Sequence, residues 1–238
     1  MAASMADAKK RRAAEAALAH IPAGSVLGVG TGSTVRFLIE ALAARPGQVR
    51  AAVSSSNAST ALLDAAGIPV LDLNDVADLH LYVDGADEAT RARHLIKGGG
   101  GALTREKIVA AVARKFICIA DQSKFVEVLG NFPLPIEVIP FGLGATRRAI
   151  EKAFAACGVS GQMAVRKAKD GHVFVTDGGH WIVDAQLGRI ADPPSLAKAL
   201  SAIPGVVEHG LFIGLASSAV LAGGEGIRVI ERRKPKGD

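Results

Sequence analysis

Residues 25–42 read SVLGVGTGSTVRFLIEAL, and this stretch decides the fold class. Its first five residues, 25–29, form a short and mostly apolar run, which is typical of a buried strand. After glycines at 28, 30 and 32, apolar residues recur at 35, 38, 39 and 42, the spacing of one helix face. A strand, a glycine-rich turn and a helix in this order predict an α/β unit, with Ser33 or Thr34 as the helix cap.

The same alternation continues on both sides of this stretch. Further strands are expected at 49–53, 68–73, 79–83 and 116–120, and further helices at 8–19, 57–66 and 104–114. Short apolar strands that alternate with helices are typical of a parallel sheet covered on both faces. The sequence therefore predicts an α/β fold with a doubly wound, mostly parallel, Rossmann-like sheet.

The pattern changes near Pro133. A strand is expected at 136–139, helices at 145–157 and 193–203, and two or three antiparallel strands within 161–187. This predicts an inserted α+β subdomain at 133–205, with residues 1–132 plus 206–238 as the Rossmann-like catalytic domain. The β-like segments 206–213 and 227–231 are candidates to return to the main sheet.

Composition restricts the class further. With 238 residues, 49% of them hydrophobic, the chain can bury a sizeable core. No run of about 18 apolar residues is present to span a membrane. Near the N-terminus, Asp7 and four cations occupy the place where a signal peptide needs an apolar run. We therefore expect a cytoplasmic protein without a membrane partner.

Charge and metal-ligand spacing exclude other classes. The net charge of +5 suits nucleic acid, but the basic clusters lie at 9–12 and 232–236, and only 4% of residues are aromatic. An anionic small substrate explains the charge equally well, so we expect no nucleic-acid partner. Cys118 and Cys157 stand in apolar contexts, and the six histidines show no ligand spacing. We therefore expect no metal and no cofactor.

Three loops carry candidate chemistry, and the first is the glycine-rich turn. Small residues there let backbone N–H groups approach a phosphate at a helix N-terminus. Position 33 is Ser where a dinucleotide fingerprint needs glycine, and no Gly-Lys-Ser/Thr follows. Hydroxyls on Thr31, Ser33 and Thr34 favour a single phosphate monoester; the alternative is a tight turn without a ligand.

The second loop is Asp84-Gly85-Ala86-Asp87-Glu88, which follows a predicted strand. Ligands of open α/β sheets bind beyond the carboxyl ends of the strands. Three carboxylates in five residues could accept hydrogen bonds from sugar hydroxyls or hold a divalent ion, and the lack of further ligand spacing favours hydroxyls. The alternative is an acidic helix cap or a surface turn.

The third loop begins at Lys97 and continues through four glycines to residue 101. Such a run costs backbone entropy, so it is better explained by backbone wrapped around a ligand, or hinged over it, than by a linker. Glu106 follows in the first turn of a helix and is a candidate general base; the alternative is a charge that favours the helix dipole. Lys124, after the next strand, is a candidate phosphate contact or a surface lysine.

Together these motifs closely resemble the type A ribose-5-phosphate isomerase family. The resemblance rests on GVGTGST at 28–34, DGADE at 84–88, KGGGGA at 97–102 with Glu106, and DQSK at 121–124. It extends through PIEVIPF at 135–141 and IPGVVEHGLFIG at 203–214, and so covers nearly the whole chain. Residues 178–180, Gly-Gly-His, depart from the family pattern; we expect them to leave the site unaffected.

The resemblance implies the interconversion of D-ribose 5-phosphate and D-ribulose 5-phosphate through an enediolate, in the pentose phosphate pathway. It implies Glu106 as the base, Lys97 as the oxyanion partner, and Asp84 and Asp87 for ring opening and hydroxyl binding. The implied substrate-binding residues are Thr31, Gly32, Ser33, Thr34, Asp84, Gly85, Ala86, Asp87, Lys97, Gly98, Gly99, Gly100 and Lys124. A homodimer or homotetramer is also implied.

Two other classes stay open at this point. One is a sugar-phosphate sensor like the effector domains of some transcription regulators, although residues 1–24 are too short for a helix-turn-helix. The other, based on charge alone, is a nucleic-acid-associated protein, which predicts salt-sensitive DNA binding.

Overall fold

The computed structural model describes residues 4–231. These residues form two compact units. The first contains the described residues up to Ala86, residues 108–125, and those from Gly214 onward; the second contains 87–107 and 126–213. Residues 87–107, 126–132 and 206–213 thus group with the second unit, and the division into domains at 133 and 205 stays a prediction. The basic run at 232–236 lies outside the described residues.

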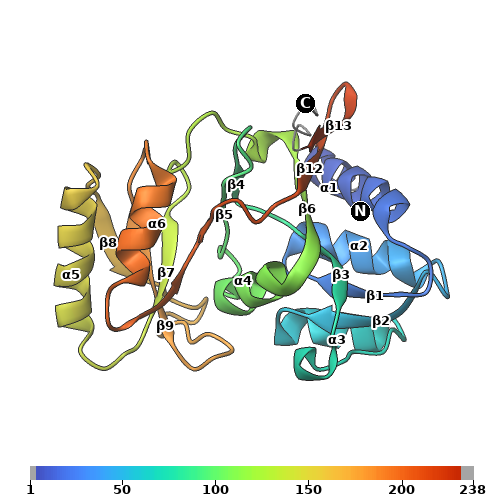
Figure 1. The fold of residues 1–238 in the computed structure, drawn as a ribbon, viewed down its shortest axis with the longest axis horizontal. Helices are drawn as coiled ribbons and strands as arrows, with labels where there is room; N and C mark the ends of the chain where they lie inside the picture. The colour runs from blue at the N-terminus through green and yellow to red at the C-terminus, as the bar shows by residue number, and fades with distance from the viewer. Residues whose placement is uncertain (1–3, 232–238) are drawn as a thin grey trace, which may run out of the picture. The chain divides into compact units, whose positions relative to one another are not determined.

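The first unit contains a six-stranded, mostly parallel sheet, which confirms the predicted fold class (Figure 1). Its strands are β1 (Ser25–Val29), β2 (Val49–Ser54), β3 (Leu79–Asp84), β6 (Ala113–Asp121), β12 (Ser218–Gly223) and β13 (Gly226–Glu231). The spatial order is β13-β12-β6-β3-β1-β2, and only β13 runs antiparallel to its neighbour. All five parallel strands therefore end at one edge of the sheet.

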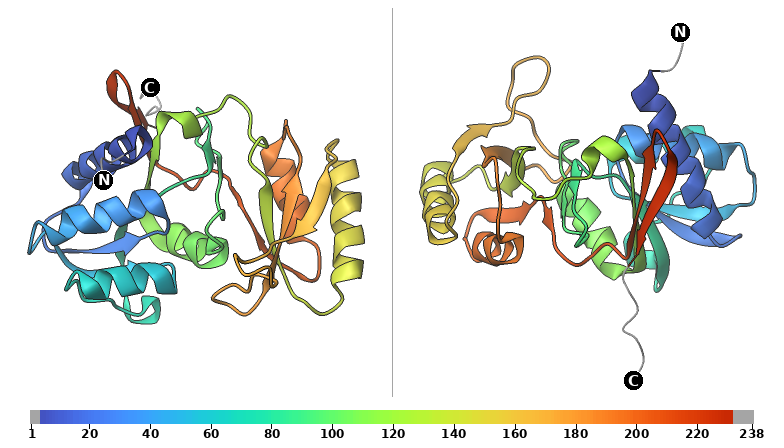
Figure 2. Two further views of the ribbon diagram at one scale, coloured as in Figure 1. Left: turned by 180° about the vertical axis from the view of Figure 1, so that it is seen from behind. Right: turned by 90° about the horizontal axis from the view of Figure 1, so that it is seen from above.

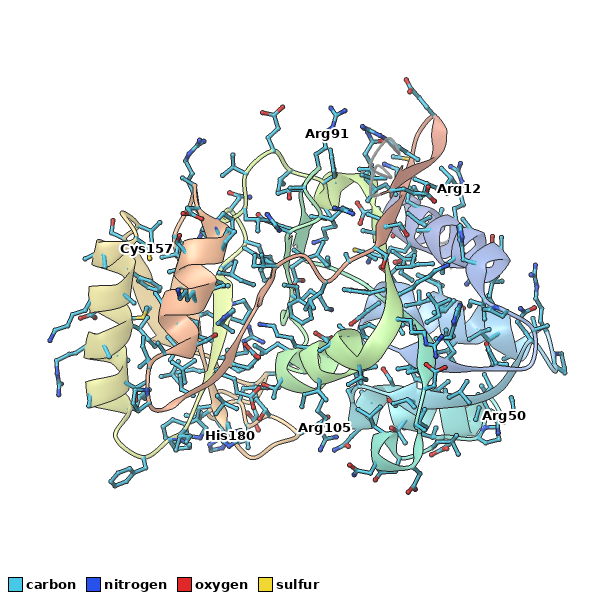
Figure 3. All side chains as sticks on the ribbon, in the orientation of Figure 1. Arg12, Arg50, Arg91, Arg105, Cys157 and His180 are labelled. Atoms are coloured by element: carbon cyan, nitrogen blue, oxygen red, sulfur yellow. The ribbon has the colours of Figure 1, made fainter. Side chains whose placement is uncertain are left out.

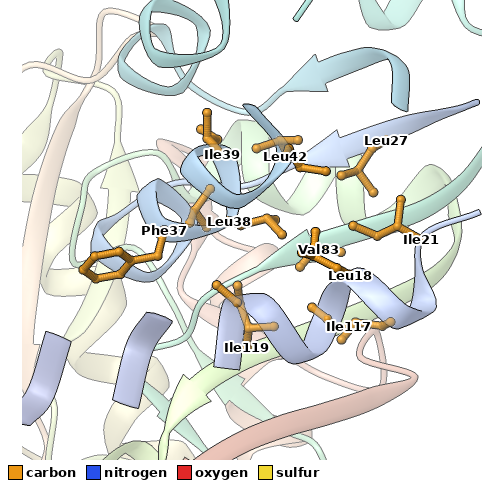
Figure 4. Packing of buried hydrophobic residues seen from close by; sticks show 14 of the residues in the cluster. Leu18, Ile21, Leu27, Phe37, Leu38, Ile39, Leu42, Val83, Ile117 and Ile119 are labelled. Carbon is orange, nitrogen blue, oxygen red and sulfur yellow. The ribbon is translucent and has the colours of Figure 1, made fainter. Parts of the chain in front are cut away.

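Helices cover both faces of this sheet. They are α1 (Met5–Ala17), continued by a 3-10 turn at Leu18–His20, α2 (Ser33–Ala43), α3 (Asn57–Ala65) and α4 (Leu103–Val112), which contributes its second half to this unit. Figure 4 shows Leu38 and Leu42 of α2 and Leu18 after α1 packed around Leu27 and Val83 of the sheet. On the opposite face, Val109 of α4 and the ring of Tyr82 both lie against Gly28.

Two local expectations for the first unit are wrong, and one strand was not predicted. The cap of α2 is Gly32, without a side-chain hydrogen bond, rather than Ser33 or Thr34. Residues 68–73 form only a single bridge, Val70 to Ala52, because Pro69 has no N–H to continue a ladder. Strand β12 was not expected, since the glycines and serines around it interrupt the apolar pattern.

The second unit contains an antiparallel sheet in the order β10-β7-β9-β8, packed against two helices (Figure 2). The elements are β7 (Leu134–Val138), α5 (Leu143–Ala156), β8 (Gln162–Val165), β9 (Trp181–Gln186), α6 (Pro193–Ser201) and β10 (Val206–His209). Alternate residues of β7, such as Leu134 and Ile136, are buried with Ile150 of α5 and Leu196 of α6. Pro135 and Glu137 therefore belong to the face away from the helices.

A short three-stranded sheet completes the second unit. It consists of β4 (Glu88–Ala89), β5 (Leu95–Ile96) and β11 (Leu211–Phe212). Residues 206–213 were expected to return to the main sheet, but β10 pairs with β7 and β11 with β5. The ladder hydrogen bonds are made by the backbone, so strand character alone does not indicate which sheet a strand joins. Residues 227–231 do return, within β13.

Between residues 4 and 231, no helix has the length and apolar character needed to cross a bilayer.

Candidate active site

In the first unit, the turn after β1 is shaped by close contact with Asp84. A Cβ atom on Gly30 would lie 1.9 Å from the Asp84 carboxyl carbon, so only glycine fits there. The Thr31 N–H donates to Asp84 Oδ1 at 3.0 Å, and the Gly85 N–H donates to the same oxygen at 2.6 Å. The Tyr82 hydroxyl donates to Oδ2. Asp84 is fully buried, which excludes a surface turn as its role.

Serines after β2 hold the turn from the other side. The Thr31 hydroxyl donates to Ser56 Oγ at 2.7 Å, and the Ser59 hydroxyl donates to the Gly30 carbonyl at 2.6 Å. The amide and hydroxyl of Thr31 are therefore both engaged within the protein. Sequence reasoning missed Ser56 and Ser59; the triple serine at 54–56, at the end of a strand, was the available signal.

The start of α2 is the open part of this turn. Gly32 and Ser33 are exposed, and Thr34 is half-buried. The first amides of an α-helix have no intrahelical acceptor, and the helix dipole favours an anion there. Lys124, half-buried, lies in the same unit in a 3-10 turn (Gln122–Lys124) that follows β6. Both α2 and this turn follow strands of the parallel sheet at their carboxyl ends.

In the second unit, Lys97 and Glu106 form a buried ion pair. Lys97 Nζ lies 3.1 Å from Glu106 Oε2, and only 3% of the Lys97 side chain and 4% of the Glu106 side chain are exposed. Lys97 follows β5, and Glu106 lies in the first turn of α4, as predicted. An ion pair removed from water in this way is costly to build and serves stability poorly, so a chemical role is favoured.

Asp87 and Glu88 bind backbone amides of this unit. The Gly99 N–H donates to Asp87 Oδ2 at 2.8 Å, so the half-buried Asp87 lies against the glycine run. Glu88 accepts from the amides of Gly130 and Phe132 at 2.7 and 2.6 Å. The carboxylate of Glu88 is thus committed to holding the loop before β7, and Asp87 is the one that contacts the predicted site residues.

A second group of charges lies near the ion pair, because Lys107 and Lys97 both contact the ring of Phe212. Lys107 Nζ donates to Glu208 Oε1 at 2.7 Å and to the His209 carbonyl at 2.6 Å. Burial lowers the pKa of Lys107, against the opposing effect of Glu208. Burial, and then the positive charge of Lys107, lower the pKa of His209 to about 4. The ring of Phe212 contacts both lysines, with its centroid 5.3 Å from Lys97 Nζ and 4.9 Å from Lys107 Nζ.

The segment that departs from the family pattern contacts the helix of Glu106. His180, labelled in Figure 3, has Nδ1 3.0 Å from Glu137 Oε1. Glu137 also accepts a hydrogen bond from the Thr104 hydroxyl at 2.5 Å, and Thr104 lies in the first turn of α4. Hydrogen bonds through Glu137 thus link His180 to the helix that carries Glu106, and the expectation that residues 178–180 leave the site unaffected stays a prediction.

The predicted residues thus gather in two sets. The first unit brings together Thr31, Gly32, Ser33, Thr34, Asp84, Gly85 and Ala86, and it also contains Lys124. The second unit brings together Asp87, Lys97, Gly98, Gly99, Gly100 and Glu106. Within the described part of the chain, no three His, Cys, Asp or Glu side chains are grouped to hold a metal ion.

Fold and site define a class of protein. An open helix N-terminus on a parallel α/β sheet is suited to binding a phosphate, and a buried lysine–glutamate pair is suited to general base catalysis. The family model of ribose 5-phosphate isomerase A, or phosphoriboisomerase A, matches residues 51–226. The chain belongs to this family.

Individual relatives agree with this assignment. The ribose-5-phosphate isomerase A of Bradyrhizobium diazoefficiens is 66% identical, and the match covers 98% of this chain and 99% of the relative. The crystal structure of ribose 5-phosphate isomerase A from Neisseria gonorrhoeae matches with a TM-score of 0.86 and 40% identity, over 97% of this chain and 99% of that one. A D-ribose-5-phosphate isomerase in complex with phospho-erythronic acid matches with a TM-score of 0.88 and 33% identity, over 96% and 100%.

Proposed function

We propose that this protein interconverts D-ribose 5-phosphate and D-ribulose 5-phosphate. The observation that carries the proposal is the buried Lys97–Glu106 pair, 3.1 Å apart, in a chain of this family. The reaction moves a proton between C2 and C1 of the open-chain sugar. It needs a carboxylate to carry that proton and a cation beside the oxygen that becomes negative.

In the forward direction, Glu106 takes the proton from C2 of the aldose, and the electron pair moves toward the C1 oxygen to give an enediolate. Lys97 stabilises the developing negative charge, which exists fully only after proton removal. Glu106 then returns the proton to C1, and the proton of the C2 hydroxyl passes to the C1 oxygen, so that C2 becomes the ketone and C1 a hydroxymethyl group. A positioned base of this kind contributes about 10²–10⁴-fold in rate.

The remaining predicted residues bind and prepare the substrate. The open start of α2, with Gly32, Ser33 and Thr34, and the side chain of Lys124 bind the phosphate. Asp87 and Asp84 hold hydroxyls and assist ring opening, and Asp84 also fixes Thr31 and Gly85 through the hydrogen bonds described above. Ala86 and the glycines at 98–100 complete the set of proposed substrate-binding residues.

The direct test is to incubate the protein with ribose 5-phosphate in deuterated water without added metal. We expect ketose product with solvent deuterium at the transferred position, because a carboxylate exchanges its proton with solvent. A protein that binds sugar phosphates without turnover would favour the sensor instead. Turnover abolished by EDTA would contradict the proposed metal-free proton transfer.

The proposal includes a cytoplasmic homodimer or homotetramer that works in the non-oxidative pentose phosphate pathway. Exposed apolar side chains in the second unit support self-association: Phe141 is 91% exposed and Ile139 is 43% exposed. Light scattering of the purified protein, compared with the variant Phe141→Ser, measures the assembly state. A monomeric wild-type protein contradicts this part of the proposal.

A further inference from the structure

The glycine run after Lys97 is held in place by a side chain far along the chain. Arg166 Nη1 donates to the Gly98 carbonyl at 2.7 Å and to the Gly99 carbonyl at 3.2 Å. Arg166 and both glycines belong to the second unit, as does the Lys97–Glu106 pair. We propose that Arg166 is a positioning residue for the isomerisation, which holds the backbone between Lys97 and Glu106 in its working conformation; this inference rests on the proposed function.

A partner carboxylate fixes Arg166 itself. Its Nε donates to Asp184 Oδ2 at 2.9 Å and its Nη2 to Asp184 Oδ1 at 2.5 Å, a two-pronged pair that defines the plane of the guanidinium. The Arg166 side chain is 13% exposed and Asp184 is 26% exposed, so water screens the pair only partly. Asp184 pairs with Pro135 in the sheet, on the face away from α5 and α6, and Pro135 also lies against Gly98.

The peptide group between Gly98 and Gly99 is bound at both ends. Its oxygen accepts from Arg166, and its N–H donates to Asp87 Oδ2. A trans peptide is planar with its oxygen and N–H on opposite sides, so two bonds define its orientation. The oxygen of the next peptide also accepts from Arg166, which directs the Gly100 N–H toward the opposite side.

Residues 166–174 form a hairpin, closed by the antiparallel bridge between Lys167 and Val173, and this hairpin makes a second contact with the glycine run. The Phe174 N–H donates to the Arg166 carbonyl at 2.9 Å, which sets these two residues side by side. A Cβ atom on Gly101 would lie 2.4 Å from the Phe174 ring, so the ring packs directly on the glycine backbone. Four glycines would otherwise sample many conformations, and each would move Lys97 relative to Glu106.

Charge alone does not explain Arg166, because Asp184 already neutralises it. The guanidinium of Arg166 donates to Asp184 and to the two glycine carbonyls at the same time, and the single ammonium group of a lysine lacks this planar set of donors. Arg166→Lys and Arg166→Met are therefore both expected to lower kcat, by about 10- to 100-fold, the cost of a small misplacement of catalytic groups. KM is expected to change less than about threefold, because the loss is of transition-state geometry rather than of phosphate binding.

Arg147→Met is the matched control. Arg147 lies in the same unit and donates to a backbone carbonyl, that of Met163, at 3.1 Å. This variant also loses an arginine-to-carbonyl bond, but away from the glycine run, so its kcat is expected to match that of the wild-type protein. Thermal unfolding of all variants shows whether Arg166→Met is destabilised more than the control.

Amide hydrogen exchange at residues 98–101, measured without substrate, is the second readout. Faster exchange in Arg166→Met than in Arg147→Met, together with the loss of kcat at a similar unfolding temperature, supports the proposal. Wild-type kcat in Arg166→Met overturns it, and so does a loss of kcat with unchanged exchange at 98–101. A wild-type protein without activity on ribose 5-phosphate overturns the proposed function. The exchange data still show, independently of activity, whether Arg166 holds the backbone at residues 98–101.

Discussion

Two glycine-rich segments serve this protein in opposite ways. The turn at 28–34 ends in an exposed helix start, where Gly32 and Ser33 face solvent. The run at 98–101 is bound by Asp87, Arg166 and Phe174. In the first segment, glycine allows a buried carboxylate to approach and leaves donors open to a ligand. In the second segment, the glycines have no side chains of their own, so side chains from elsewhere can approach the backbone and fix it beside a buried ion pair.

This contrast predicts that the second segment serves the chemical step and the first serves binding. The strongest test is Glu106→Gln, which keeps the shape of the side chain but removes the base. We expect kcat to fall by about 10²–10⁴-fold with little change in KM. Steady-state kinetics with ribose 5-phosphate measures both constants. Retained activity would show that Glu106 is not the base, and it would contradict the assignment of the second segment to the chemical step.

The second test concerns the packing of the first segment. Gly30→Ala places a methyl group against the buried carboxylate of Asp84, and we expect a loss of about 1–3 kcal/mol of stability from overpacking. Gly224→Ala is the control, because no atom lies within 4 Å of its added Cβ. Urea unfolding of both variants measures the difference. Equal stabilities would show that Asp84 is not held as tightly as the structure indicates.

The third test measures how the free energy of unfolding depends on pH, and it concerns His209 in the second unit. His209 has a pKa of about 4 when folded and 6.5 in its ordinary state, so the unfolded chain binds the proton first as pH falls. Stability is therefore lost from about pH 6.5 down to about pH 4, by at most about 3 kcal/mol. The control is the exposed His172, in the hairpin.

In His209→Asn we expect a flatter dependence of the unfolding free energy over that range, whereas His172→Asn keeps the wild-type slope. The same slope in both variants would exclude His209 as the source.

The smallest effect is expected at the open helix start. Ser33→Ala removes one hydroxyl donor to a phosphate, worth about 1.5 kcal/mol, or about tenfold in KM. We expect kcat at saturating substrate to stay near the wild-type value. Ser195→Ala, at the start of α6 in the other unit, is the control for losing a serine near a helix start. A fall in kcat without a rise in KM would contradict the binding role.

Local patterns predicted most of the framework. The apolar strand at 25–29 and the helical spacing at 35–42 were enough for the first α/β unit, because both signals lie within one segment. Glu106 was predicted as a base from its place in the first turn of the helix after the glycine run, and the role of Lys97 was predicted from the family resemblance. Strand β12 was missed because glycines and serines around it interrupt the apolar pattern. The partners of β10 and β11 were missed because backbone pairing leaves no mark in the side chains of a single strand.

The supporting residues of the site were beyond sequence reasoning. Arg166 binds a carbonyl 68 residues away, and Glu137 binds a hydroxyl 33 residues away. Such contacts depend on how sheets and loops pack, and an arginine or glutamate in a polar segment has many other possible partners. Tyr82 is a similar case: it lies in the predicted strand at 79–83, and only the structure shows that its hydroxyl donates to Asp84.

The six-stranded sheet is completed only late in the synthesis of the chain. Strands β1, β2, β3 and β6 have all been made once residue 121 leaves the ribosome, but β12 and β13 come from residues 218–231. Until then β6 is an open edge of the sheet, with apolar residues such as Ile117 and Ile119 and unpaired backbone groups. The nascent chain must keep that edge from pairing with other chains while about a hundred further residues are added, since a pairing this distant in sequence forms slowly.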